Sequence, residues 1–239
     1  MLMTPLAQVS AQIILAETEF EEASTGATSF TPGPGDSEIG WALTTPDVIS
    51  SNAGVASGTP WTPTDDAGNT PSYTIASPSN TQVFNFTQDF GDTATLTFDN
   101  VTGLGSSTGK EVSVVWIPTG WTGPGAFDSS AFESSDTVQI FVDVVDGGSP
   151  STLTLFDSTA SANGLNDVSS GTAFRTDSLS LADTVTEAQV RIEFGNVNFQ
   201  EAAAFDSVKL TAVPEPGTAA LLSLGFGALF LCAGRRRRC

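Results

Sequence analysis

Histidine is absent from this chain of 239 residues. Histidine supplies the general base of Ser-His-Asp and Cys-His nucleophilic centres, and its imidazole is a common ligand of zinc. Its absence excludes those catalytic centres, general bases built on histidine, and ordinary zinc sites. The sequence also contains no glycine-rich phosphate loop and no Cys/His metal spacing, so the short signatures of nucleotide and zinc binding are missing.

Cysteine is scarce and confined to one end of the chain. Cys232 and Cys239 are the only two, and both lie near the C-terminus. The preceding part of the chain therefore has no disulfide. Its stability must come from a packed core or from a bound metal. A length of about 200 residues is enough for one large β domain.

Basic residues are few before Gly217, and this sets the charge of the chain. Four basic residues oppose 27 acidic ones there, which gives that part a formal charge of −23. Nucleic-acid binding is excluded, because phosphate contacts need a basic surface. An anionic polysaccharide would need a bridging cation. An acidic surface of this kind favours solubility and attracts divalent cations.

The C-terminal segment has the features of a membrane span. No residue from Gly217 to Gly234 is charged, and seven of them are Leu or Phe. A spanning helix needs ~20 such residues, with ~17 as the lower limit. Arg235, Arg236, Arg237 and Arg238 follow directly, and the positive-inside rule places them in the cytoplasm. A buried core helix is the alternative, but it rarely ends in an unneutralised arginine cluster. The sequence therefore predicts a single C-terminal transmembrane helix.

A short motif precedes this span. Prolines on both sides of Glu215, in Val213-Pro214-Glu215-Pro216, disfavour helix and strand pairing, so the segment is predicted to be extended and accessible. The motif, span and arginine cluster together resemble the PEP-CTERM sorting signal of Gram-negative, exopolysaccharide-producing bacteria. This resemblance implies that an exosortase in the inner membrane cleaves near the motif and releases or transfers the protein.

The N-terminus suggests part of an export signal. Val9-Ser10-Ala11 is a plausible small-residue cleavage site, but no Lys or Arg precedes it and the apolar stretch is short. We therefore expect a start inside a longer signal peptide and a mature chain beginning near Gln12. The expected division is 1–11 for the partial signal peptide, 12–212 for a folded domain, and 213–239 for the sorting signal.

The body alternates apolar and polar residues with a period of two, which is typical of strands. No helix of convincing period occurs between Gln12 and Val213, and 54–79 is predicted to be a long loop rich in Pro, Thr and Ser. The spacing predicts an all-β fold, an antiparallel two-sheet β-sandwich. The expected strands lie within 13–20, 39–43, 83–86, 93–98, 112–116, 137–144, 153–155, 179–181, 189–194 and 208–210.

Two ends of the body resemble those of a galactose-binding-like jelly roll, a fold of many carbohydrate-binding modules. Phe20-Glu21-Glu22 matches the Phe-Glu of the first strand and is followed by a glycine-rich loop and Gly40-Trp41, and 204–210 matches the last strand. The resemblance implies a structural calcium held by Glu21 and Asp206. Strict alternation independently places Asp206 on the face of Val208 and Leu210, where a carboxylate must be paired or bound to metal. The alternative is a carboxylate that caps a turn.

Two loop tryptophans are candidates for sugar stacking. Trp61 lies in Thr-Pro-Trp-Thr-Pro and Trp121 in Gly-Trp-Thr-Gly-Pro. An exposed ring beside Asp and Asn would form a carbohydrate platform, whereas a ring folded back would cover an apolar edge. In contrast, Trp116 lies in phase with the strand residues Val112 and Val114 and is expected in the core.

The expected function is that of a non-enzymatic cell-surface or extracellular-matrix protein associated with exopolysaccharide, with carbohydrate as the candidate ligand. A secreted polysaccharide-active enzyme with two catalytic carboxylates is the alternative, and a purely structural protein without a ligand is the third possibility. Carboxylate pairs are too frequent in this acidic chain for any one to stand out; they are Glu21/Glu22, Asp65/Asp66, Glu133/Asp136 and Asp143/Asp146.

Overall fold

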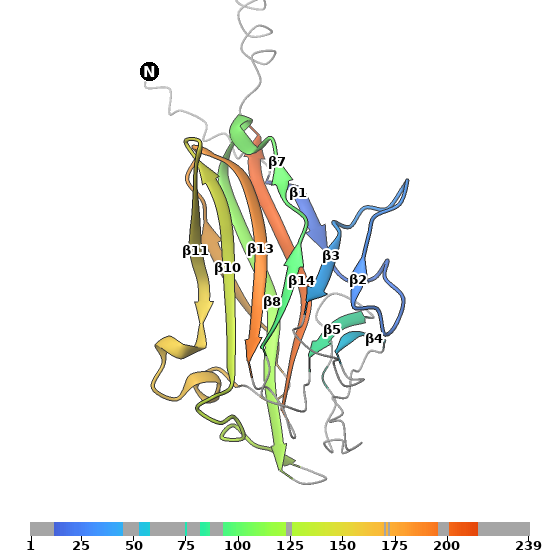
Figure 1. Ribbon diagram of the computed structural model, residues 1–239, viewed down its shortest axis with the longest axis vertical. Helices are drawn as coiled ribbons and strands as arrows, with labels where there is room; N and C mark the ends of the chain where they lie inside the picture. The colour runs from blue at the N-terminus through green and yellow to red at the C-terminus, as the bar shows by residue number, and fades with distance from the viewer. Residues whose placement is uncertain are drawn as a thin grey trace, which may run out of the picture.

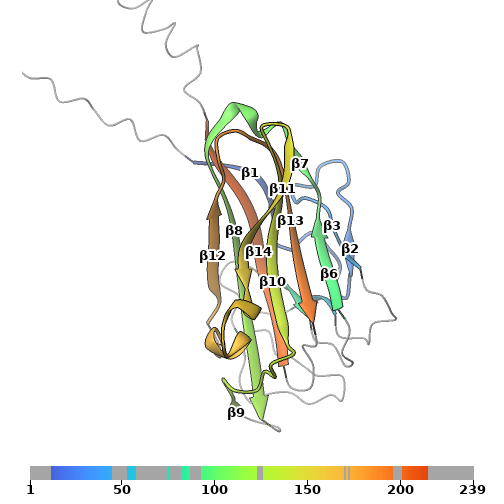
Figure 2. The same cartoon turned by 60° about the vertical axis from the view of Figure 1, so that its left-hand side comes forward.

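A computed structural model shows two packed β-sheets (Figures 1 and 2). It describes residues 12–44, 53–57, 75, 82–86, 93–122, 126–169, 171, 173–195 and 201–214. Within these residues each sheet has seven strands, and every strand pairing is antiparallel. The predicted all-β, two-sheet antiparallel sandwich is therefore confirmed.

The first sheet, sheet A, runs in the order β12-β8-β14-β5-β4, with β1 beside β14 and β9 beside β8. Its long central strands β8 and β14 pair along most of their length. The strands are β1 Ile13–Thr18, β4 Gly54–Ser57, β5 Gln82–Phe86, β8 Ser107–Thr122, β9 Ala126–Phe127, β12 Arg175–Ser180 and β14 Glu201–Pro214.

The second sheet, sheet B, runs in the order β11-β10-β13-β6-β3-β2, with β7 beside β13. Three short 3-10 helices connect strands: η1 Leu104–Ser106, η2 Ser158–Ala160 and η3 Gly164–Asp167. The strands are β2 Ser29–Phe30, β3 Trp41–Thr44, β6 Thr93–Phe98, β7 Val101–Thr102, β10 Thr137–Asp146, β11 Ser149–Asp157 and β13 Val185–Gly195.

The main core lies between the sheets and is rich in aromatic rings. Alternate residues of β10, at positions 138, 140, 142 and 144, are buried in it, as the period of two predicts. Trp116 stacks on Phe205 with ring centroids 5.8 Å apart, and Phe86 stacks on Phe194 at 4.1 Å. The prediction that Trp116 belongs to the core is confirmed, since the ring is fully buried.

A β-bulge in β14 changes the phase of that strand. Phe205 pairs with Trp116 and Ser207 with Val115, so Asp206 is an extra residue on β14. Phe205 and Val208 therefore both face the core. Asp206 instead lines a hollow with Ser113, Thr176 and Lys209 on the outer side of sheet A. The expectation that Asp206 shares a face with Val208 and Leu210 is wrong, because strict alternation does not survive the bulge.

The extents of several elements also differ from prediction. The stretch 54–79, predicted to be a loop, contains β4 and a bridge residue at Ile75, both in contact with the folded domain. The last strand reaches Pro214, two residues beyond the expected end of the domain. Among the described residues there is no helix of the length and hydropathy needed to cross a bilayer. The predicted span at 217–234, the arginine cluster and the signal peptide at 1–11 lie outside them.

Candidate functional site

The outer face of sheet B presents polar side chains in regular rows. The buried residues of β10 point inward, so Gln139, Phe141 and Asp143 point outward. The strand register then sets their neighbours: Asp143 lies between Thr152 of β11 and Gln189 of β13. Three antiparallel strands, β11, β10 and β13, thus fix the positions of these polar side chains.

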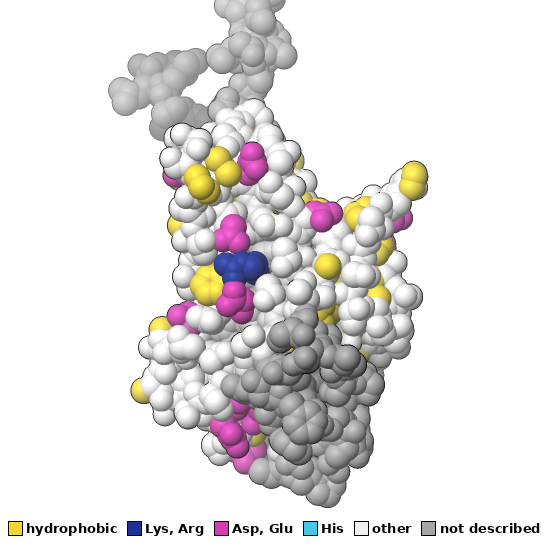
Figure 3. Space-filling model, in the orientation of Figure 1, with side chains coloured by type: hydrophobic (Ala, Val, Ile, Leu, Met, Phe, Trp, Pro, Cys, Tyr) yellow, Lys and Arg dark blue, Asp and Glu magenta, His cyan; other side chains and the backbone are white. Residues whose placement is uncertain are grey.

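Arg191 organises the centre of this surface. Its Nε donates to Asp143 Oδ2 at 3.1 Å, and its Nη1 pairs with the Glu193 carboxylate. The guanidinium carbon lies 4.8 Å from the centre of the Phe141 ring, which is a cation–π distance. Figure 3 shows this arrangement as a basic patch over β10 and β13, flanked by acidic side chains and with an apolar one beside it.

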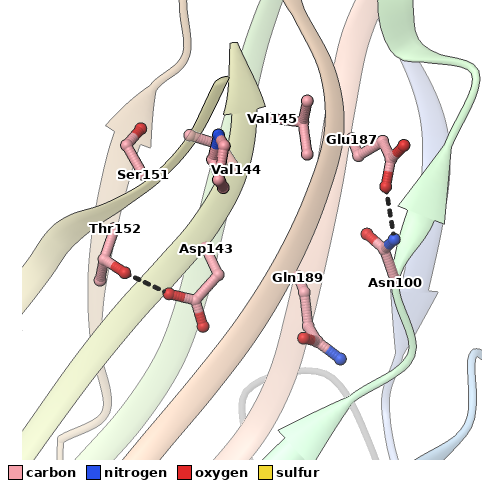
Figure 4. A pocket seen from close by; sticks show the side chains of 9 residues that line it. Asn100, Asp143, Val144, Val145, Ser151, Thr152, Glu187 and Gln189 are labelled. Atoms are coloured by element: carbon pink, nitrogen blue, oxygen red, sulfur yellow. Dashed lines mark hydrogen bonds between the residues drawn. The ribbon is translucent and has the colours of Figure 1, made fainter. Parts of the chain in front are cut away.

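A hollow of about 380 Å³ lies next to Arg191 on the same surface. Asp143 and Thr152 lie on one side of it, Asn100 and Glu187 on the other, and Gln189 between them (Figure 4). Its lining residues are Asn100, Asp143, Val144, Val145, Pro150, Ser151, Thr152, Glu187 and Gln189.

Hydrogen bonds hold most of these polar groups in place. Thr152 Oγ1 donates to Asp143 Oδ1 at 2.5 Å, Asn100 Nδ2 donates to Glu187 Oε2 at 2.8 Å, and Gln189 Nε2 donates to the Phe98 carbonyl at 2.8 Å. Partial burial alone would raise the pKa of Asp143, but the hydrogen bond from Thr152 and the adjacent Arg191 bring it below its ordinary value. Asp143 therefore stays ionised at neutral pH, and the hollow offers fixed acceptors beside amide groups.

A second polar hollow, of about 310 Å³, lies at the end of the sandwich that carries η2 and η3 (Figure 1). Its lining includes Asp136, which is 2% exposed, and Ser158, Asn163 and Asn166. The Glu133 backbone N–H donates to Asp136 Oδ2. The side chain of Glu201, also buried, shares a hydrogen bond with Asp136.

The pKa of the buried Asp136 carboxyl is raised above its ordinary value. Burial raises its pKa to about 6, and the negative charge of Glu133 also raises it, against the lowering effect of the hydrogen bonds from the Glu133 N–H and the Glu201 side chain. Glu201 was not identified from the sequence as the partner of Asp136, because 65 residues separate them and no local pattern links them. Hydrogen-bonded carboxyls lie closer than the ~5–5.5 Å of a retaining glycosidase pair or the ~6.5–9.5 Å of an inverting pair.

The two predicted calcium ligands have different surroundings. Glu21 Oε1 accepts the Gln82 backbone N–H at 2.7 Å, whereas Asp206 is fully buried beside the hollow of about 230 Å³ on the outer face of sheet A. Strict alternation would place Lys209 on the face opposite to Asp206, but Lys209 lines the same hollow. Over the described parts of the chain, no group of three or more His, Cys, Asp or Glu residues could hold a metal ion.

The predicted platform at Trp121 is not exposed. Its ring is 1% exposed, and it packs on the outer face of sheet A with Ile117 and Ala204 in a second apolar cluster. The loop prediction failed because β8 continues to Thr122 and pairs there with β9. Trp121 is therefore not an exposed platform, and its ring covers an apolar surface, as the alternative predicted. Trp61 lies outside the described residues.

The sorting motif begins inside sheet A. Val213 pairs with Thr108 and Pro214 with Ser107, at the start of β8. Thr108 Oγ1 donates to the Val213 carbonyl at 3.4 Å. The expectation that prolines keep the whole motif out of a ladder is wrong for these two residues, because Pro214 is the last residue of its strand and needs no amide hydrogen there. Glu215 and Pro216 lie outside the described residues.

Comparison with solved structures finds several distant similarities. The carbohydrate-binding module TmCBM61, solved with β-1,4-galactotriose, is 10% identical, with a TM-score of 0.41 over 71% of this chain and 86% of that one. A cyclase from Fischerella sp. TAU is 16% identical, with a TM-score of 0.44 over 87% and 100%. The K3 cleaved adhesin domain of Lys-gingipain from Porphyromonas gingivalis w83 is 12% identical, with a TM-score of 0.41 over 84% and 99%. Structures this distant identify no activity for the chain.

Sequence comparison is informative only for the C-terminal segment. The search of curated proteins found no match. Residues 212–238, in contrast, match the PEP-CTERM protein-sorting motif, as the residues of the tail had indicated. Such a motif implies an exported protein that is held at a membrane before an exosortase processes it. The chain therefore carries a PEP-CTERM sorting motif that begins within the last strand of its β-sandwich and continues to residue 238.

Proposed function

We propose that this chain is an exported, exosortase-sorted protein without catalytic activity, whose sandwich binds carbohydrate through the outer face of sheet B. The C-terminal helix would hold it in the inner membrane until processing releases it to the cell surface or the extracellular matrix. There it would associate with exopolysaccharide. The observation that carries the binding proposal is the hollow beside Arg191, with its ordered hydrogen-bonding groups.

The chemistry of the hollow suits a ligand rich in hydroxyl groups. The carboxylates of Asp143 and Glu187 can accept hydrogen bonds from hydroxyls, and the amide of Asn100 can both donate and accept. Val145 and Pro150 supply apolar contact for C–H groups. The volume of about 380 Å³ falls within the roughly 300–1,000 Å³ of small-molecule sites.

The charge of the face narrows the class of glycan. Asp143 and Glu187 line the hollow, and the guanidinium of Arg191 beside it is already paired with Asp143 and Glu193. A uronate or sulfated sugar would be repelled by this arrangement. We therefore propose a neutral polysaccharide, or one that carries amino groups, as the ligand.

A glycan array with the mature secreted protein tests this function. We expect binding to neutral or amino-bearing glycans, and loss of that binding in Thr152→Val, which removes the hydrogen bond to Asp143. Thr176→Val is the matched control, because Thr176 is also an exposed strand threonine but lies in sheet A. Equal loss in both variants, or no binding by the wild type, would contradict the assigned face.

A glycan that binds on the array can then be used to distinguish binding from catalysis. A polysaccharide-active enzyme would release shorter saccharides from the bound glycan over hours, whereas a binding protein leaves the chain length unchanged. We expect chromatography of the glycan after incubation to show no new products. New reducing ends that depend on Asp136 or Asp143 would favour the competing function, an enzyme with two catalytic carboxylates.

A further inference from the structure

We infer that the peptide bond cut during sorting lies C-terminal to Pro214, so that the mature protein keeps the whole of β14. This inference rests on the proposed processing by an exosortase. The sorting match begins at Ala212, yet Ala212, Val213 and Pro214 are strand residues of sheet A. The folded domain and its sorting signal therefore overlap in these three residues.

The three residues are held on an internal strand. The second half of β14 lies between β1 and β8: Ala212 pairs with Ile13 of β1, while Val213 and Pro214 pair with β8. The side chain of Ala212 is fully buried. Val213 lies over Gly109, whose φ is +55°, and a Cβ at Gly109 would lie 3.4 Å from Val213 Cγ2. Backbone pairing and side-chain packing both fix this strand end.

Three features end the strand at the same place. Its partner β8 begins at Ser107, which pairs with Pro214, so β8 offers no residue beyond this point. The segment before Ser107 turns away as η1, Leu104–Ser106. Finally, the residue at the end is a proline, which has no amide hydrogen to donate to a ladder. Pro214 is therefore the last residue that pairs with β8 in the described part of the chain.

A processing enzyme must bind the backbone on both sides of the bond that it cuts. Peptides are recognised in an extended form, largely through their main-chain hydrogen bonds. The main-chain groups up to Pro214 are already committed to sheet A. A cut before Pro214 would require β14 to be peeled from two neighbouring strands, whereas a cut after Pro214 leaves the sheet intact.

The chemical step needs only an amide and a nucleophile. The C–N bond on the C-terminal side of Pro214 or of a later residue breaks. Water adds its hydroxyl to the carbonyl carbon, which becomes the new carboxyl group, and its remaining proton goes to the leaving amine. In a transfer reaction an amine of an acceptor molecule takes the place of water. Neither route consumes an oxidant or a reductant.

Mass spectrometry of the mature protein from its native host tests the inference. We expect the C-terminal peptide to end at Pro214 or at a later residue of the signal. A C-terminus at Val213 or earlier would overturn the inference while leaving the proposed processing intact. A full-length chain ending in Cys239 on the cell surface would instead contradict the processing itself.

A linker variant tests the physical reason. Inserting Gly-Ser-Gly-Ser between Val213 and Pro214 moves the whole Pro-Glu-Pro motif away from the sheet. We expect processing of this variant to be about 2- to 10-fold faster in a pulse-chase experiment, because less of the extended substrate is shielded. The same insertion in the exposed turn Gly147–Gly148 is the control and should leave the rate unchanged. An unchanged rate in the linker variant would show that β14 does not limit access.

Discussion

The outer faces of the two sheets differ, and the difference locates the candidate site. On sheet B, buried and half-exposed residues alternate along β10 and β13, so one face is open to solvent. On sheet A, every residue from Trp116 to Trp121 and from Glu201 to Val208 is buried. A sheet that is buried on both faces loses its alternation. The outer face of sheet A is thus covered along 116–121 and 201–208. Sheet B presents the surface on which a ligand can lie.

The two faces nevertheless share one electrostatic motif. Arg191 on sheet B is paired with Asp143 and Glu193, and Lys209 on sheet A is paired with Glu17 and Glu19. Each cation is about a quarter exposed. Only Arg191 adjoins the larger polar hollow and an aromatic ring. These two clamps, each a cation held between two carboxylates, can therefore be compared: a change at Lys209 is the control for a change at Arg191 in tests of carbohydrate binding.

Removing the ring of Trp121 from the apolar cluster on the outer face of sheet A should have the largest effect on stability. Trp121→Ala empties a fully buried site among Ile117, Val83 and Ala204. We expect the free energy of unfolding to fall by about 3–5 kcal/mol, as for other buried aromatic residues. Urea denaturation followed by tryptophan fluorescence measures this.

The control for Trp121 is its strand neighbour. Phe127 pairs with Trp121 but is 37% exposed, so Phe127→Ala should cost about 1 kcal/mol or less. Equal losses in the two variants would contradict the view that sheet A is covered at this end.

Calcium should have the next largest effect, if the predicted site at Glu21 and Asp206 exists. The bulge in β14 moves Asp206 to the outer face of sheet A, so the ion would be bound on the covered sheet. At 100 times its dissociation constant, calcium would stabilise the fold by ~2.7 kcal/mol. Thermal melting in EDTA and in calcium should show a higher midpoint with calcium for the wild type, and none of that gain for Asp206→Ala. An unchanged wild-type midpoint would show that calcium does not bind to the folded domain.

Regular alternation is the part of this fold that the sequence predicts well. The strands around Val138–Val144 and Val190–Phe194 were correctly placed because one of their faces is open. The failures occur where alternation stops. Trp121 lies in a Gly- and Pro-rich stretch that signals a loop, yet tertiary contacts hold it in a strand. The bulge at Asp206 leaves no local mark, because its cause is the register between β8 and β14.

The candidate site was harder to predict than the fold. Asp143, Thr152, Gln189 and Arg191 come from three strands, and each is an ordinary polar residue in its own segment. Only the pairing of β11, β10 and β13 brings them together. The sorting motif is the opposite case, since its residues are contiguous in the chain and could be read directly.

The third prediction concerns the end where the two sheets meet. Asp136 precedes β10 of sheet B, and Glu201 begins β14 of sheet A. The pKa of Asp136 is about 6 in the folded state and ~3.9 in an unfolded chain. The folded state therefore binds more protons between these values, so this carboxyl stabilises the fold fully below pH ~4 and loses that contribution as pH rises through about 6.

Asp136→Asn isolates this contribution from the other carboxylates. Glu133 and Glu201 face Asp136, and both side chains are unchanged in the variant. We expect the wild type to lose on the order of 1–2 kcal/mol of stability relative to Asp136→Asn between pH ~4 and pH ~7. Urea denaturation at each pH gives the difference. A difference that does not change with pH, or that changes in the opposite direction, would show that folding does not raise the pKa of Asp136.

The smallest expected effect on stability compares the two clamps. Arg191→Met and Lys209→Met each remove one partly exposed cation from two carboxylates, and pairs of this kind are worth about 0.2–1 kcal/mol. Methionine keeps much of the apolar stem, so packing changes little. The two variants should therefore unfold at nearly the same urea concentration.

Their carbohydrate binding should differ. Without Arg191, Asp143 keeps the hydrogen bond from Thr152 but loses the one from the guanidinium, and Phe141 loses its cation. Affinity should therefore fall by about tenfold, or ~1.4 kcal/mol. Lys209→Met should bind as the wild type does. Calorimetric titration with a glycan selected on the array measures both, and a loss of affinity in Lys209→Met alone would move the binding surface to sheet A.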